Sequence, residues 1–148
     1  MTETVVVYAD GGSRGNPGPS AIGAVVFDPS TSPPTRLAAV SERIGVTTNN
    51  VAEYKALIAG LQAAQQFSPG TVHVRADSKL VIEQLAGRWK VKQPHLKPLH
   101  AQARALLDTF ARVDLAHVPR EQNTDADALV NAALDLPESL GPGSLGPD

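Results

Sequence analysis

The hydrophobic pattern changes once along the chain, and this change limits the possible folds more than any other feature. Before residue 50, three β-rich segments at residues 4–9, 22–28 and 37–44 are separated by turns rich in Gly, Pro and Ser. Consecutive segments of this kind predict an antiparallel meander. From residue 52 onwards, apolar residues recur at helical spacing, and helical segments alternate with two short β-rich segments.

The second part predicts helices at residues 52–67, 78–85, 96–110 and 125–134, with strands at 71–76 and 113–118. Three paired strands followed by alternating helices and strands predict an α/β fold with one five-stranded mixed sheet. Residues 1–135 then form one domain. The remaining residues, 136–148, are rich in Pro and Gly, and we expect a disordered tail or the start of a linker.

Composition excludes several classes of protein. The chain has no Cys, which excludes disulfides, thiolate chemistry and Cys-bound zinc. Its N-terminus has no basic segment, and no stretch approaches the ~20 apolar residues of a membrane span. We therefore expect a cytoplasmic protein that does not bind membranes. The formal net charge of −2 argues against a globally basic nucleic-acid binder.

One segment is nevertheless basic. Residues 84–107 contain no acid, and within them residues 88–97, here called the basic stripe, include Arg88, Lys90, Lys92 and Lys97. Such a stripe can follow a phosphate backbone even on an acidic protein. The alternative is a solvated face without a partner. Trp89, which lies within the stripe, is expected to pack in the core.

Four acids fall near the ends of predicted elements, namely Asp10, Glu53, Asp77 and Asp127. The ends of neighbouring parallel strands lie at one edge of a sheet, so these carboxylates could converge there. Like charges held close together raise one another's pKa, and divalent cations with hard oxygen ligands, Mg²⁺ or Mn²⁺, would neutralise them. Two such ions roughly 3.5–4 Å apart can activate a water molecule and stabilise the leaving oxygen of a phosphodiester.

Each acid also has a purely structural explanation. Asn50 and Glu53 resemble a variant capping box, and Asp77 or Ser78 could cap the following helix. Asp10 could belong to a turn before two glycines, and the last acid could favour a helix N-terminus. Spacing alone does not select four acids from the 15 in the chain.

Four motifs decide between these interpretations: YADGGSRGNPGP at residues 8–19, TTNNVAEY at 47–54, ADSKLV at 76–81 and NTDADAL at 123–129. In this order they resemble the motifs of type 1 ribonucleases H. The resemblance is to the handle-less bacterial and archaeal branch, which includes the N-terminal domain of bifunctional ribonuclease H/phosphatase proteins of actinobacteria. It implies a ribonuclease H-like fold with helices on both faces of the sheet.

The resemblance also implies an activity and a set of site residues. The expected enzyme is a monomeric endonuclease, without an obligate protein partner, that hydrolyses the RNA strand of RNA–DNA hybrids to 5′-phosphate and 3′-hydroxyl ends. Two Mg²⁺ or Mn²⁺ ions would be held by the catalytic acids Asp10, Glu53, Asp77 and Asp127. Contacts with the hybrid would come from Arg14, Gly15, Asn16, Thr48, Asn49, Asn50, Ser78 and Lys79. Amide side chains suit this task because they can both donate to and accept from the RNA 2′-hydroxyl.

The chain departs from the family pattern in two places. The basic handle that many members insert after the third motif is missing, and we expect Lys90 and Lys92 of the basic stripe to replace it in part. The mobile His of many members has no clear counterpart, because His117 is assigned to the last strand. Arg120, at the tip of the following loop, is expected to take over that role as a catalytic residue.

Three other functions are compatible with parts of this pattern. A module that binds hybrids without cutting them would not need all four acids. A transposase or a junction resolvase would share the acid cluster, but the GNPG loop and the TTNN segment fit type 1 ribonucleases H better. A small-molecule phosphoesterase with two metal ions would be separated by comparing cleavage of a hybrid with that of a mononucleotide.

Overall fold

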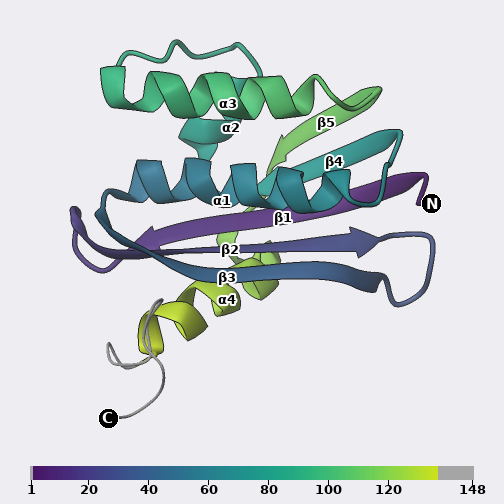
Figure 1. Cartoon of the computed structure of the whole chain (residues 1–148), viewed down its shortest axis with the longest axis horizontal. Helices are drawn as coiled ribbons and strands as arrows, with labels where there is room; N and C mark the ends of the chain where they lie inside the picture. The colour runs from purple at the N-terminus through teal and green to yellow at the C-terminus, as the bar shows by residue number, and fades with distance from the viewer. Residues whose placement is uncertain (1, 137–148) are drawn as a thin grey trace.

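The computed structural model describes residues 2–136, which form one mixed β-sheet covered by α-helices (Figure 1). The strands are β1 (Thr4–Ser13), β2 (Gly18–Asp28), β3 (Thr35–Thr47), β4 (Thr71–Ala76) and β5 (Arg112–His117). The helices are α1 (Asn49–Gln65), α2 (Lys79–Leu85), α3 (Lys97–Leu107) and α4 (Thr124–Asp135), with short 3-10 turns η1 (Pro94–Leu96) and η2 (Arg120–Gln122). Within residues 2–136, no helix is long and apolar enough to cross a membrane.

The strand order is β3-β2-β1-β4-β5. The first three strands pair antiparallel, whereas β4 pairs parallel with both β1 and β5. This confirms the predicted five-stranded mixed sheet. Parallel strands need a crossover connection, and here α1 leads into β4, while α2 and α3 lead from β4 to β5.

The first strand is longer than the sequence pattern predicted. It continues past Ala9 because Gly11 and Gly12 pair with Ile22 and Ala21 in the antiparallel ladder with β2. The expectation that the first strand ends at Asp10 is therefore wrong, since the strand continues to Ser13. The parallel pairing of β1 with β4, however, ends at Ala9. Asp10 is thus the first residue of β1 beyond its parallel partner.

Helices cover both faces of the sheet, as expected, with α1, α2 and α3 on one face and α4 on the other (Figure 1). The alternation of side chains along β2 shows why. Ile22, Ala24 and Val26 belong to the large core beneath α1, whereas Ala21 packs against Val130 of α4.

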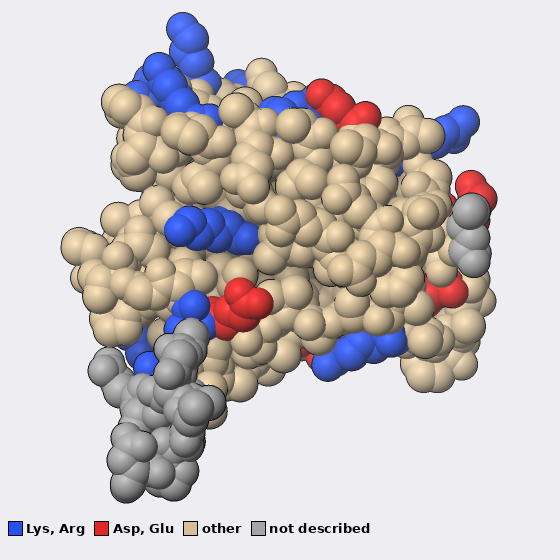
Figure 2. Space-filling view, viewed as in Figure 1, with Lys and Arg blue, Asp and Glu red and all other residues tan. Residues whose placement is uncertain are grey.

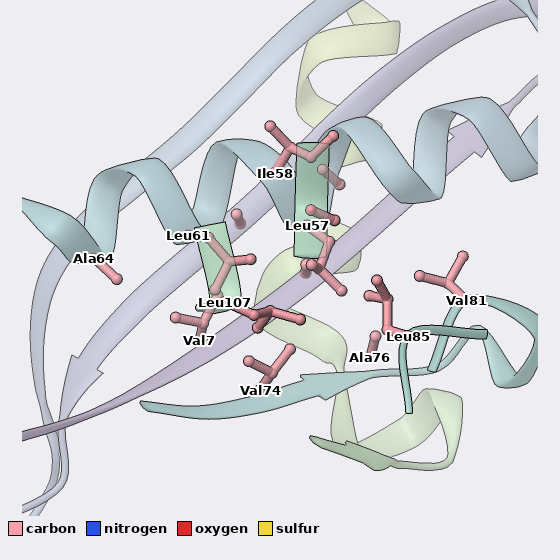
Figure 3. Close-up of a cluster of buried hydrophobic side chains, with 14 of the residues drawn as sticks. Val7, Leu57, Ile58, Leu61, Ala64, Val74, Ala76, Val81, Leu85 and Leu107 are labelled. Carbon is pink, nitrogen blue, oxygen red and sulfur yellow. The ribbon is translucent and has the colours of Figure 1, made fainter. Parts of the chain in front are cut away.

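The two faces differ in how much apolar surface they bury. The large core joins Val7 of β1 and Val74 of β4 to Leu57 and Leu61 of α1 and Leu107 of α3 (Figure 3). Each such side chain contributes roughly 1.5–3 kcal/mol when fully buried. The cluster beneath α4 is much smaller, with three buried residues, Ala21, Val130 and Ala133. Apolar packing therefore holds α4 less firmly than it holds α1.

Two glycines let the helices approach the sheet closely beside Asp10. A Cβ atom on Gly11 would lie 2.2 Å from the backbone carbonyl of Ala52 in α1. On the other face, a Cβ atom on Gly23 would lie 2.3 Å from the carbonyl oxygen of Ala126 in α4. Gly23 is the antiparallel partner of Asp10. Neither position has room for a side chain unless the helix moves away.

We predict that Gly23→Ala lowers the free energy of unfolding by about 1–3 kcal/mol, because the new methyl group must displace α4. Urea denaturation measures this loss. Gly12→Ala is the matched control, since its Cβ atom would meet only a Val130 methyl group, at 3.3 Å. Equal losses in the two variants would contradict the close approach of α4.

Candidate active site

Three of the four predicted acids line one cleft. The cleft has a volume of about 610 Å³, and its walls include Asp10 of β1, Asp77, which follows β4, and Asp127 of α4. Asn49, Arg14 and Arg120, which were also predicted as site residues, lie in the same wall. The fourth acid, Glu53, lies in α1 beside Gly11, and its charge reaches Asp10. The structure thus brings all four acids to one end of the sheet.

Burial and mutual repulsion disturb two of these carboxyl groups. The pKa of Asp10 is raised to about 8, first by burial and then by the charges of Asp77 and Asp127, a hydrogen bond with Asp127, and the charge of Glu53. The pKa of Glu53 is raised to about 7 by burial and by the charge of Asp77, against the opposing effect of a hydrogen bond from Ser78. Strongly shifted carboxyl groups in a cleft are typical of functional sites.

The start of α1 removes the structural explanation for Glu53. The N-cap is Thr48, whose Oγ1 accepts a hydrogen bond from the backbone N–H of Val51 at 3.4 Å. The capping box considered for Asn50 and Glu53 is therefore wrong. Glu53 lies beyond the first turn of the helix and is left to face the other acids.

The start of α2 leaves Asp77 without a capping role in the same way. Ser78 is the N-cap, and its Oγ accepts from the backbone N–H of Val81 at 3.3 Å. Ser78 is only 8% exposed, and its hydroxyl also bonds to Glu53. Ser78 thus contacts one acid of the cluster. Its contact with the hybrid stays a prediction.

The two acids at the start of α4 have different surroundings. Asp127 accepts hydrogen bonds from Arg120 at 3.5 Å and from Asn131 Nδ2 at 3.4 Å, and all three residues line the cleft. Asp125 instead lies 3.8 Å from Arg36, outside the cleft. Sequence analysis missed Asn131, although its position four residues after Asp127 places both side chains on one face of a helix.

The donor chemistry of the cluster fits a hard divalent cation, because carboxylate oxygens are the ligands that Mg²⁺ and Mn²⁺ prefer. Among residues 2–136, however, no three acidic or His side chains are arranged as a ready metal site. The metal-binding roles of the four acids therefore stay predictions. A cation would offset both the burial and the repulsion that raise the pKa of Asp10.

Hydrogen bonds join the glycine-rich loop to the start of α1. The backbone N–H of Asn49 donates to Asn16 Oδ1 at 3.0 Å, and the N–H of Ser13 donates to Asn49 Oδ1 at 2.9 Å. Gly15 adopts a φ of 99°, which side chains rarely tolerate. Within the described chain no residue accepts from the NH₂ groups of Asn16 and Asn49, so these donors are free for a ligand.

Arg14 connects the loop to the far end of α4, where its guanidinium lies 2.7 Å from Asp135 Oδ1. Both side chains are about half exposed or more, at 49% and 65%. An ion pair of this kind contributes at most about 1 kcal/mol. A phosphate could therefore replace Asp135 as the partner of Arg14.

A second groove, of about 630 Å³, contains the first part of the basic stripe. Its walls include Asn50, Arg88, Trp89, Lys90 and Lys92. The expectation that Trp89 packs in the core is wrong, because Trp89 is 44% exposed and lies beneath the ammonium group of Lys79, 5.7 Å from its ring centroid. Leu96, which is fully buried, anchors this segment to the core instead.

Not every cation of the stripe is free to meet a phosphate. Glu83, which precedes the acid-free segment, accepts from Arg88 at 2.6 and 3.0 Å and lies 3.8 Å from Lys79. Lys and Arg side chains still gather at the end of the molecule where the segment between α2 and α3 lies (Figure 2). Lys90 and Lys92 are the cations that this groove contributes besides Arg88.

Comparison with known proteins identifies the family. A family model described as reverse transcriptase-like matches residues 8–133. The chain is 53% identical over 131 residues to a bifunctional protein of Mycobacterium tuberculosis. The match covers 88% of this chain but only 35% of that protein. The chain thus spans about a third of the length of this relative.

Two solved structures are also similar along almost their full length. The RNase H1 of Halobacterium salinarum has a TM-score of 0.84 and 45% identity, covering 89% of this chain and 98% of that one. LC11-RNase H1, solved in complex with an RNA/DNA hybrid, has a TM-score of 0.81 and 42% identity, covering 88% and 96%. The family model covers all four motifs and the four acids, and the chain belongs to the ribonuclease H family.

Proposed function

We propose that this chain is an endonuclease that hydrolyses the RNA strand of RNA–DNA hybrids. The observation that carries the proposal is the gathering of Asp10, Glu53, Asp77 and Asp127 at one end of the sheet, with a raised pKa at Asp10 and at Glu53. The similarity to LC11-RNase H1, which was solved with a hybrid, supports the choice of substrate.

The four acids are proposed to hold two Mg²⁺ or Mn²⁺ ions. When bound, such ions activate a water molecule for attack on phosphorus and stabilise the leaving oxygen, which gives 5′-phosphate and 3′-hydroxyl ends. The chain's own part is to hold the oxygen ligands in place. The Ser78 hydroxyl binds Glu53, and Asn131 binds Asp127.

Contacts with the RNA strand are assigned to the loop beside the acid cleft. The free NH₂ groups of Asn16 and Asn49 can donate to a 2′-hydroxyl, and Gly15 lets the backbone approach the strand closely. Arg120 is 77% exposed and borders the cleft, so its guanidinium can reach a scissile phosphate after leaving Asp127. His117 ends β5 and lines the same cleft, and it stays the alternative to Arg120.

Two neighbouring residues favour a duplex over a small phosphoester. Asn49 lines the acid cleft, whereas Asn50 lines the basic groove. The N-terminus of α1 therefore separates two binding surfaces that a mononucleotide cannot occupy together. We propose that the RNA strand lies in the acid cleft and that the DNA strand contacts Thr48, Asn50, Lys79, Lys90 and Lys92.

Residues 1–135 are proposed to be the ribonuclease domain, acting as a cytoplasmic monomer without an obligate protein partner. The family model, which ends at residue 133, supports this boundary. The tail predicted at residues 136–148 lies, apart from its first residue, outside the described residues.

We predict that Asp10→Asn or Asp77→Asn lowers hybrid cleavage by more than about 100-fold, since loss of a mere supporting contact at a metal site already costs 10–100-fold. Cleavage of labelled hybrid, RNA duplex, DNA duplex and single strands, with Mg²⁺ and with Mn²⁺, measures this. Asp125→Asn is the matched control, because Asp125 lies on the same helical turn as Asp127 but faces Arg36. Near-normal cleavage by Asp10→Asn would sink the proposal.

We also predict how pH affects stability in the presence of a chelator. The pKa of Asp10 rises from 3.8 to about 8 on folding, so the folded chain binds the proton more tightly. Stability from this group is complete below about pH 4 and is lost as the pH rises towards 8. Asp10→Asn removes this loss, so its Tm should exceed that of the wild type by a margin that grows with pH. A constant or negative difference in calorimetry would refute this.

The third prediction tests the basic groove. Charge reversal at Lys90 and Lys92 should raise the Kd for the hybrid and flatten its salt dependence. With fewer phosphate contacts, fewer counterions are released when the hybrid binds. The slope of log Kd against log salt should fall by up to about 2. Charge reversal at Lys55 and Arg112, which line neither groove, is the control. Identical slopes in the two double variants would make the stripe ordinary surface.

A further inference from the structure

Asn123 is a buried polar residue at the start of α4 that the proposed mechanism does not use. Its side chain is 1% exposed, and its Nδ2 donates to the backbone carbonyl oxygen of Ala9 at 2.9 Å. Ala9 precedes Asp10 in β1. The backbone carbonyl oxygen of Asn123 in turn accepts a hydrogen bond from the backbone N–H of Asp127 at 3.1 Å. One residue therefore links the backbone beside Asp10 to the helical turn that carries Asp127.

The hydrogen bonds that β3 side chains make with α4 are less buried and lie further along the helix. Ser41 Oγ donates to the carbonyl oxygen of Leu129 at 2.7 Å in an exposed position. Arg43 Nε donates to the carbonyl oxygen of Ala133 at 2.9 Å in a partly buried one. Of the three contacts, only that of Asn123 is fully buried and lies next to the acids. With few apolar contacts beneath α4, this bond has a large share in fixing the start of the helix.

Helix capping does not explain Asn123. Asn is common at N-caps because its side-chain oxygen accepts from the N–H groups of the first turn. Here Asn123 occupies the N-cap of α4, but its side chain makes no hydrogen bond with the helix. Its Oδ1 is buried and has no partner within the described residues. A buried acceptor without a partner lowers stability, so the contact with β1 is kept at the expense of capping.

We propose that Asn123 is a positioning residue that holds Asp127 at the distance from Asp10 that divalent-cation binding requires. This inference rests on the proposed function, because it assigns both acids to one metal site. Gly23 lets α4 approach the sheet, but the absence of a side chain there does not fix the distance between Asp127 and Asp10. The hydrogen bond between Asn123 and Ala9 fixes this distance, because it joins the start of α4 to one carbonyl group of β1.

The test is the affinity of the full chain for Mn²⁺, measured by isothermal titration calorimetry well below the Tm. Asn123→Ala should raise the Kd for Mn²⁺ by about 10–100-fold, the range typical of partners that orient metal ligands. Asn123→Ser should do the same with little loss of stability, since Ser caps helices well but is too short to reach Ala9. Hybrid cleavage by both variants should recover as the Mn²⁺ concentration is raised.

Val72→Ala is the control for a general loss of stability. Val72 is fully buried near the opposite end of β4, away from Asp77. The Kd of the Val72→Ala variant for Mn²⁺ should equal that of the wild type. Wild-type affinity in Asn123→Ser, or equal weakening in Val72→Ala, would overturn the positioning role alone. Failure of the wild type to bind Mn²⁺ would overturn the proposed function as well.

Discussion

The parallel pairing of β1 with β4 places the first two acids side by side. Its last pair joins Ala9 to Ala76, so Asp10 and Asp77 are the next residues along the two neighbouring segments. A slip of one residue in β1 would turn Asp10 towards the opposite face of the sheet, because side chains alternate along a strand. The buried valines of both strands resist such a slip, since they too would change faces. The core beneath α1 thus fixes the register on which the acid cluster depends.

The two faces of the sheet contribute unequally to stability. The face beneath α1 holds the large core, whose side chains carry no charge. The other face carries α4 on a small apolar cluster, and there Asp127 approaches Asp10 closely enough to help raise its pKa. Repulsion of this kind destabilises the fold locally. The large core allows the chain to tolerate it, and a bound cation would relieve it.

Sequence patterns predicted most of the helices and strands, because hydrophobic periodicity is a local property, and the four acids that the motifs singled out lie at one end of the sheet. The patterns failed where a distant partner decides the outcome. Gly11 and Gly12 read as a turn, but pairing with β2 makes them part of a strand. Trp89 was expected in the core, but Leu96 takes the buried position in its segment. The bond from Asn123 to a carbonyl 114 residues away leaves no local trace.

The missing handle changes where binding must come from. The N-terminus of α1 lies between the acid cleft and the basic groove, with Asn49 in one and Asn50 in the other. The positive end of the helix dipole lies at this terminus, so the terminus itself favours the phosphates of the substrate. A single strand can fill one of these surfaces, whereas a duplex can bind both at once. Because the two contacts then act together, we infer that selection for a duplex follows from the spacing of the two grooves, without a separate gripping element.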